Sequence, residues 1–281
     1  MKNILVPCDF SKASEQALRF AIEIAALSQG EVRVLHVINL TPDYIQTLET
    51  NPYYVDSMSI LAELKRQAAD DFDELMQKVD TGNVPVKLTI EQGLISHAIL
   101  KSIHQHNADL VVMATNGASG LSEILVGSNT EKIVRSSPVP VFAVHKNQKA
   151  EQIKNIVFPT TIELNKGALI EKVKALQAFF NARLYLLHVK TPESRQKDHE
   201  LKMALENFAR FYDLENYLAV IKQAKTEEEG IIRFARQLEC SIIAMSTHGH
   251  TGLTHLMLGS VAENVVNHCP EAVWTYTAHE A

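Results

Sequence analysis

Short apolar runs alternate with amphipathic stretches along the chain. Four runs in the first half are nearly continuous in Val, Ile, Leu and other apolar residues, at 4–7, 32–37, 109–114 and 139–144. Strands covered on both faces of a parallel sheet have this composition. Between the first two runs, apolar residues recur at the i, i+3, i+4, i+7 spacing of one helix face. The alternation predicts right-handed βαβ units in a doubly wound sheet.

The second half of the chain repeats the pattern of the first. The matching segments are 3–10 with 155–162, 32–37 with 184–189, 108–117 with 240–249, and 139–144 with 271–276. We therefore expect two tandem α/β domains, at 1–146 and 153–281, each with five strands. The offset between the halves falls from 152 to 132 residues along the chain. The first half thus holds about 20 extra residues, which we expect within 41–58.

Composition narrows the class of protein. The 281 residues suit two domains of ordinary size, and the formal net charge of −6 argues against a surface for nucleic acid or anionic membranes. No apolar run approaches the ~20 residues of a membrane span, and the first residues are too short a stretch for a signal peptide. The three cysteines form no C-x-x-C pair. We expect a cytoplasmic protein.

The clearest candidate for chemistry is a repeated Gly-x9-Gly-Ser spacing. It is formed by Gly117, Gly127 and Ser128 in the first half, and by Gly249, Gly259 and Ser260 in the second. Each Gly-Ser step opens a predicted helix, whose unpaired N–H groups and partial positive charge can hold phosphate. Ligands of open α/β sheets bind beyond the carboxyl ends of the strands. Asp9, at the end of the first predicted strand, can reach ribose hydroxyls there.

The same step has a second interpretation. Ser128-x-x-Glu131 and Ser260-x-x-Glu263 match a capping box, in which Ser and Glu satisfy the helix's own amides. On this step alone, capping and binding are equally good interpretations. The paired upstream glycine favours binding, because a cap needs no glycine ten residues earlier. Neither G-x-x-x-x-G-K-[ST] nor a G-x-G-x-x-G after the first strand is present, which excludes ordinary P-loop NTPases and dinucleotide-dependent dehydrogenases.

Three segments resemble the universal stress protein family: ILVPCDFSKASEQALRFA, VLHV and MATNGASGLSEILVGSNTEKIVRSSPVPVFAV. Both halves are covered, so the chain resembles a tandem member. The resemblance implies two five-stranded parallel sheets in the order 3-2-1-4-5, with helices on both faces. It also implies that the halves pair through their last strands, as in the homodimer of single-domain relatives.

The resemblance further implies an adenine-nucleotide site for ATP, alone or with Mg²⁺. The matching first-half positions are Asp9, Val37, Met113, Gly117, Gly127, Ser128, Asn129 and Thr130. The second half departs from the pattern, because Thr161 stands where the first half has Asp9. Small residues, Ala114 and Ser246, also replace the leading glycine of the family motif. We expect a weaker second site at Gly249, Gly259 and Ser260.

Other residues indicate no further chemistry. His248, His250 and His255 have no Cys or carboxylate at zinc spacing, so we interpret them as loop histidines and predict no metal site. His36 and His188 hold equivalent strand positions, which favours a packing role. No catalytic residue is predicted, since nothing marks a nucleophile.

The sequence thus predicts an ATP-binding stress-response or regulatory protein with little or no hydrolysis. A slow ATPase or nucleotidyl transferase in the same cleft remains an alternative, although no Lys/Arg clamp or general base is evident. A protein-interaction module without nucleotide is the other alternative. The protein partner and any homodimer remain open.

Overall fold

The computed structural model of the protein describes residues 1–39, 57–115, 127–145, 148–164, 166–239, 241–247 and 259–277. The first half contains β1 (Asn3–Pro7), α1 (Lys12–Ser28), β2 (Glu31–Ile38), α3 (Ser57–Lys78), β3 (Val86–Gln92), α4 (Ile95–Gln105), β4 (Leu110–Ala114), α5 (Ser128–Ser136) and β5 (Val141–Val144). A 3-10 turn, η1 (Ala150–Gln152), lies between the halves. The second half contains β6 (Asn155–Pro159), α6 (Gly167–Phe180), β7 (Arg183–Lys190), α7 (Asp198–Phe211), β8 (Tyr217–Gln223), α8 (Glu227–Gln237), β9 (Ser241–Ser246), α9 (Ser260–His268) and β10 (Val273–Tyr276).

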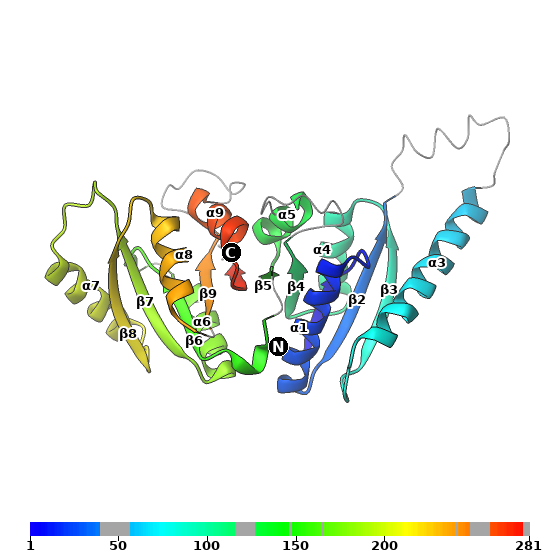
Figure 1. Cartoon of the computed structure of the whole chain (residues 1–281), viewed down its shortest axis with the longest axis horizontal. Helices are drawn as coiled ribbons and strands as arrows, with labels where there is room; N and C mark the ends of the chain where they lie inside the picture. Colours follow the sequence, from blue (N-terminus) through cyan, green and yellow to red (C-terminus); the bar gives the residue numbers. More distant parts are fainter. Residues whose placement is uncertain are drawn as a thin grey trace.

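The described strands form one ten-stranded sheet that runs through both halves (Figure 1). Its order is β3-β2-β1-β4-β5-β10-β9-β6-β7-β8, so each half has the predicted order 3-2-1-4-5. Neighbouring strands within each half are parallel. The halves meet at the antiparallel pair of β5 and β10, with Phe142 opposite Trp274. The prediction of two tandem doubly wound α/β domains is confirmed, and their five-stranded sheets join into one through the last strand of each half.

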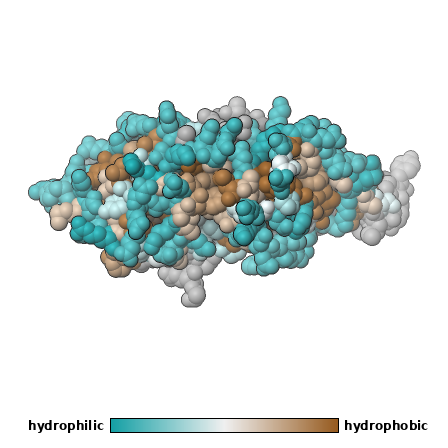
Figure 2. All heavy atoms as spheres, turned by 90° about the horizontal axis from the view of Figure 1, so that it is seen from below, coloured by the Kyte–Doolittle hydropathy of each residue, from teal (hydrophilic) through white to brown (hydrophobic). Residues whose placement is uncertain are grey.

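Helices cover both faces of the sheet and produce two apolar layers. Residues of α1, α3, α6 and α7 pack in one layer, and residues of α4, α5, α8 and α9 pack in the other. Side chains along a strand alternate between them: Ile4 and Val6 face the first layer, and Leu5 faces the second. Burial on both faces explains why these strands read as continuous apolar runs. Viewed from below, apolar residues show along the middle of the molecule with polar residues around them (Figure 2).

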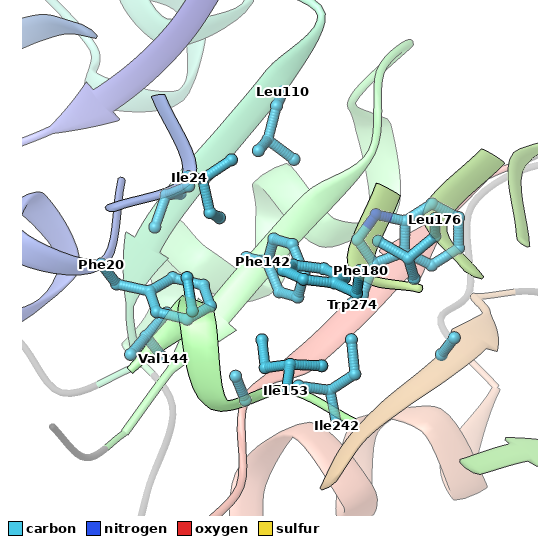
Figure 3. Packing of buried hydrophobic residues seen from close by; sticks show 14 of the residues in the cluster. Phe20, Ile24, Leu110, Phe142, Val144, Ile153, Leu176, Phe180, Ile242 and Trp274 are labelled. Carbon is cyan, nitrogen blue, oxygen red and sulfur yellow. The ribbon is translucent and has the colours of Figure 1, made fainter. Parts of the chain in front are cut away.

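Large side chains fill the junction between the halves. Phe142 and Trp274 are almost completely buried. Phe20 of α1 contacts the Phe142 ring edge to face, with 5.3 Å between ring centroids. Figure 3 shows Phe142 and Trp274 close together, with Phe20 toward the first half and Leu176 and Phe180 of α6 toward the second. One apolar cluster therefore continues across the junction, and neither half has a separate core on this face.

Two polar contacts cross the same junction in matching places. The His145 ring donates from Nε2 to the carbonyl oxygen of Val266 in α9, at 2.7 Å. The hydroxyl of Thr277 donates to the carbonyl oxygen of Val134 in α5, at 3.1 Å. Each residue following a half's last strand thus holds the corresponding helix of the other half. The pairing is fixed by polar contacts at its edge as well as by apolar packing.

The extra residues of the first half lie between its second and third strands, as expected, but not all within 41–58. Helix α3 has 22 residues and its counterpart α7 has 14, so about two turns of helix account for part of the difference. Residues 40–56 lie outside the described residues. None of the described helices is long and apolar enough to cross a membrane.

We expect the substitution Phe142→Ala to lower the free energy of unfolding by about 3–5 kcal/mol, because it leaves a cavity in a buried aromatic cluster. The measurement is urea unfolding followed by circular dichroism. Met203→Ala, at a side chain that is 64% exposed, is the control and should change stability by less than about 0.5 kcal/mol. Similar losses in the two variants would contradict a junction that depends on Phe142.

Candidate functional site

Each half has a cleft at the carboxyl ends of its parallel strands, where the chain reverses its winding direction. The first cleft lies beyond β1, β2 and β4, and the second beyond β6, β7 and β9. Six of the residues predicted for the first site line the first cleft: Asp9, Val37, Met113, Gly127, Asn129 and Thr130. Segments far apart in the sequence are thus brought to one place.

The other predicted residues fall into three groups. Ser128 is exposed beside the first cleft and is not part of its lining. In the second half, Gly259 and Ser260 line the cleft. Gly117 and Gly249 lie outside the described residues, as do His248, His250 and His255. Among the described residues, no cluster of three potential metal ligands is present.

The turn after the first strand has an unusual backbone in both halves. Phe10 has φ of 60° and Ile162, at the matching position, has φ of 68°. The left-handed region is uncommon for side chains other than glycine, and particularly so for β-branched ones. The turn holds the residue before it in place: the Ser11 N–H donates to Asp9 Oδ1 at 3.1 Å. Strained backbone of this kind is often found at binding sites.

Asp9 is the charged residue of the first cleft. Partial desolvation raises the pKa of its carboxyl group, but hydrogen bonds from Ser11 and Ser14 outweigh this and hold the pKa below its usual value. The carboxylate is therefore ionised at neutral pH and can only accept hydrogen bonds. Beneath it, Cys8 is buried, and burial raises the pKa of its thiol. Cys8 thus remains a neutral part of the wall.

The helices that begin at the clefts are capped by glycine. Gly127 is the N-cap of α5 and Gly259 is the N-cap of α9, and neither helix has a side-chain cap among the described residues. Ser128 is the first helical residue, one position too late for the cap of a capping box. Glu131 pairs with Arg135, one turn further along α5. The capping-box interpretation is therefore wrong, and no described side chain caps the first amides of either helix.

Two predicted residues have structural contacts of their own. The Thr130 side chain is buried, and its hydroxyl donates to the Ala114 carbonyl oxygen at 2.8 Å. It therefore joins the start of α5 to the end of β4. Below it, the Gly127 N–H donates to the Thr115 carbonyl oxygen at 2.6 Å. These contacts fix where the free end of α5 lies relative to the sheet.

His36 and His188 have the same role in the two halves. Nδ1 of His36 lies 3.0 Å from the Cys8 carbonyl oxygen, and Nδ1 of His188 lies 3.2 Å from that of Thr160. Since a carbonyl oxygen only accepts, Nδ1 carries the proton in each ring. Both rings hold the turn after the first strand of their half. The packing role suggested by their repeated positions agrees with this geometry.

The second cleft contains two charged residues that the comparison of motifs missed. Lys166, the N-cap of α6, and Glu227, the first residue of α8, both line it. Aligning the halves at the same offsets as the strands sets Lys166 against Ser14, and Glu227 against Ile95. Both first-half counterparts line the first cleft. An alignment of the two halves over their full length would have found both charged residues. They were missed because the repeat was recognised from its strands and glycines alone.

Comparisons with known proteins match both halves of the chain. The model of the universal stress protein family matches residues 1–145 and 152–276. A universal stress protein of Mycolicibacterium smegmatis is 21% identical over 280 residues, 93% of this chain and 92% of that protein. One from Methanocaldococcus jannaschii is 28% identical over 149 residues, 53% of this chain and 84% of that protein. The crystal structure of a universal stress protein from Archaeoglobus fulgidus has a TM-score of 0.72 at 23% identity, covering 98% of this chain and 96% of that one.

The cap geometry can be tested through stability. We expect Ser128→Ala to change the free energy of unfolding by less than about 0.5 kcal/mol, because its side chain caps nothing. Thr226→Ala is the matched comparison, because the Thr226 hydroxyl accepts from the Glu229 N–H at the start of α8. Its loss should cost about 1 kcal/mol. The measurement is urea unfolding of both variants. If Ser128→Ala lowered the free energy of unfolding as much as Thr226→Ala, Ser128 would be a helix cap after all.

Proposed function

Because the chain belongs to the universal stress protein family, we propose that it is a regulatory protein that binds an adenine nucleotide, ATP, in the cleft of its first half. The observation that carries the proposal is the combination found in that cleft: a glycine-capped helix start, an ionised carboxylate and apolar walls. A nucleotide has a part for each of them. Bound nucleotide acts as a signal in this proposal, with little or no hydrolysis.

The phosphates belong at the start of α5. Its first N–H groups have no side-chain cap among the described residues, and they add the positive end of the helix dipole. Gly127 has no side chain, so a phosphate can approach the backbone there. Ser128 is exposed beside these amides and Asn129 lines the cleft. Both side chains can donate to phosphate oxygens.

The sugar and the base belong further along the cleft. Asp9 is ionised and accepts hydrogen bonds from Ser11 and Ser14. A carboxylate with two acceptor oxygens can also accept a hydrogen bond from a ribose hydroxyl. Val37, Ile95 and Met113 supply apolar surface for an adenine ring. Mostly apolar walls with a few placed polar groups are typical of small-molecule sites.

The first cleft also fits a Mg²⁺ ion that arrives with the nucleotide. Mg²⁺ is usually held by one or two carboxylates together with substrate phosphates and water. Asp9 is the one carboxylate among the described residues that line this cleft, so it would hold the ion. The ion would supply charge neutralisation for the phosphates. A single carboxylate leaves most of the coordination to phosphate and water.

The same lining argues for slow hydrolysis. Among the described lining residues of the first cleft there is no lysine, no arginine and no second carboxylate. Phosphoryl transfer depends on such groups to stabilise charge and to orient the nucleophile. Binding without rapid turnover follows from these side chains.

Calorimetry with Mg²⁺ and ATP tests the site. We expect one tight equivalent per chain. Asp9→Ala should weaken it about tenfold to a hundredfold, the value of a hydrogen bond to a charged group. Gly127→Val should abolish binding by blocking the approach to the backbone. Gly259→Val, the matched change in the second half, should leave the tight site nearly unaltered. If Gly259→Val alone abolished tight binding, the nucleotide site would lie in the second half and the proposal would be wrong. Absence of nucleotide binding would favour a protein-interaction module.

Turnover separates the regulatory proposal from the enzymatic alternative. Purified protein with ATP and Mg²⁺ should release phosphate far more slowly than the ~1–100 s⁻¹ of kinases. The measurement is multiple-turnover phosphate release, with Gly127→Val as the control for contaminating activity. Turnover at kinase rates that disappears in Gly127→Val would make the protein an ATPase.

A further inference from the structure

The second cleft carries a cation at the wall where the first carries a carboxylate. Lys166 Nζ donates to the hydroxyl of Thr161 at 3.3 Å, and the Lys166 side chain is only 22% exposed. Thr161 holds the position of Asp9. The backbone N–H of Lys166 donates to the Tyr212 hydroxyl at 3.0 Å, which fixes the turn that carries the lysine. The lysine is therefore held at the cleft by its main chain and its side chain.

The ammonium group retains capacity for a ligand. It has three donors, and Thr161 takes one of them. The Glu163 carboxylate lies 3.5 Å from Nζ and forms an ion pair with it. An ammonium group can donate to more than one acceptor at once, so it can also donate to a group inside the cleft. An anion there would meet a cation at short range without displacing either neighbour.

The start of α9 reaches the same cleft. This nine-residue helix is capped by Gly259, whose own N–H donates to the Thr247 carbonyl oxygen at 2.9 Å. Ser260 lines the cleft, followed by Val261 and Ala262. The lysine and the helix start belong to separate elements, and both favour negative charge. The cleft encloses about 290 Å³, at the small end of the range for ligand sites.

A carboxylate and apolar walls complete the cleft. Glu227 begins α8, which packs on the opposite face of the sheet from α6, where Lys166 lies. An ionised carboxylate only accepts, so it selects a ligand group that donates, such as an amino or hydroxyl group. Leu187, Ile231 and Met245 provide the apolar surface. A ligand that fits is small, with an anionic end and a donor elsewhere.

We propose that the second cleft binds a small organic phosphate without a divalent cation, with the phosphate at Lys166 and the start of α9 and a donor group at Glu227. The proposal does not depend on what the first cleft binds. A phosphate beside Asp9 is repelled unless a cation lies between them, whereas a phosphate beside Lys166 is attracted directly. The second cleft is therefore a site with its own ligand chemistry, and its departure from the first half is a change of specificity.

The test uses the full chain with the first cleft blocked by Gly127→Val. Calorimetry with adenosine monophosphate, in EDTA and again with Mg²⁺, should show one binding event that Mg²⁺ does not strengthen. Lys166→Ser, which introduces the first half's residue, should weaken binding at least tenfold. Lys202→Ser, which removes an exposed lysine on α7, is the charge-matched control and should leave it unchanged. Glu227→Ile should weaken adenosine monophosphate severalfold.

Ribose 5-phosphate serves as a second probe. If it binds as well as the nucleoside phosphate, the donor read by Glu227 is on the sugar; if it binds more weakly, the donor is on the base. Failure of both probes to bind, binding that requires Mg²⁺, or indifference to Lys166→Ser would overturn the proposal.

The same titration on the chain without Gly127→Val keeps the test independent of that variant's folding. There Lys166→Ser must weaken the binding event seen in EDTA at least tenfold and leave Mg²⁺-ATP binding intact. If the chain bound the organic phosphate in EDTA but did not bind Mg²⁺-ATP, the proposal for the first cleft would be wrong and the proposal for the second cleft would stand.

Discussion

The antiparallel pairing of β5 with β10 is the contact on which the rest of the molecule depends. Three residue pairs join the strands, and the central one sets Trp274 against Phe142. Both side chains are buried in an apolar cluster that includes α1 and α6. His145 and Thr277, just beyond the two strands, hold the helix of the opposite half. Separating the halves would expose both aromatic side chains and leave two sheet edges unpaired, so the pairing holds the two clefts in one fixed body.

The junction is also close to both clefts. The Thr115 hydroxyl lies 2.6 Å from Nδ1 of His145, and the Thr115 carbonyl oxygen accepts from the N–H of Gly127, the cap of α5. In the second half, the Thr247 and Thr277 hydroxyls lie 2.8 Å apart, and the Thr247 carbonyl oxygen accepts from the Gly259 N–H. Each glycine cap is thus two hydrogen bonds from a residue that contacts the other half. The position of both helix starts depends on the pairing of the last strands.

Much of this architecture could be predicted from the sequence, because it depends on patterns that the chain states twice. Continuous apolar runs mark strands covered on both faces, and the repetition of these runs in the same order identifies the halves. The cap of α5 could not be predicted in the same way. The Ser-x-x-Glu pattern predicts Ser128 as the N-cap, whereas the helix that forms has its N-cap one residue earlier, at Gly127. Only backbone dihedral angles show that Gly127, with φ of −59° and ψ of 139°, is the cap. Lys166 and Glu227 were missed for another reason: they lie at helix starts, where nothing in a strand pattern draws attention to them.

Glycine at both caps has a consequence for how two equal folds can differ in chemistry. A Ser or Asp cap would occupy an N–H group at the start of the helix and place a side chain there, whereas glycine leaves the amides unengaged. The part of each cleft that we propose for phosphate is then made of backbone, which substitutions of the neighbouring side chains do not remove. Charge at the remaining wall is free to change, and it does so at three matched positions: Asp9 against Thr161, Ser14 against Lys166, and Ile95 against Glu227. The sheet fixes where the amides point, and in the scheme that we propose the side chains at these matched positions decide whether a phosphate there needs a metal ion beside it.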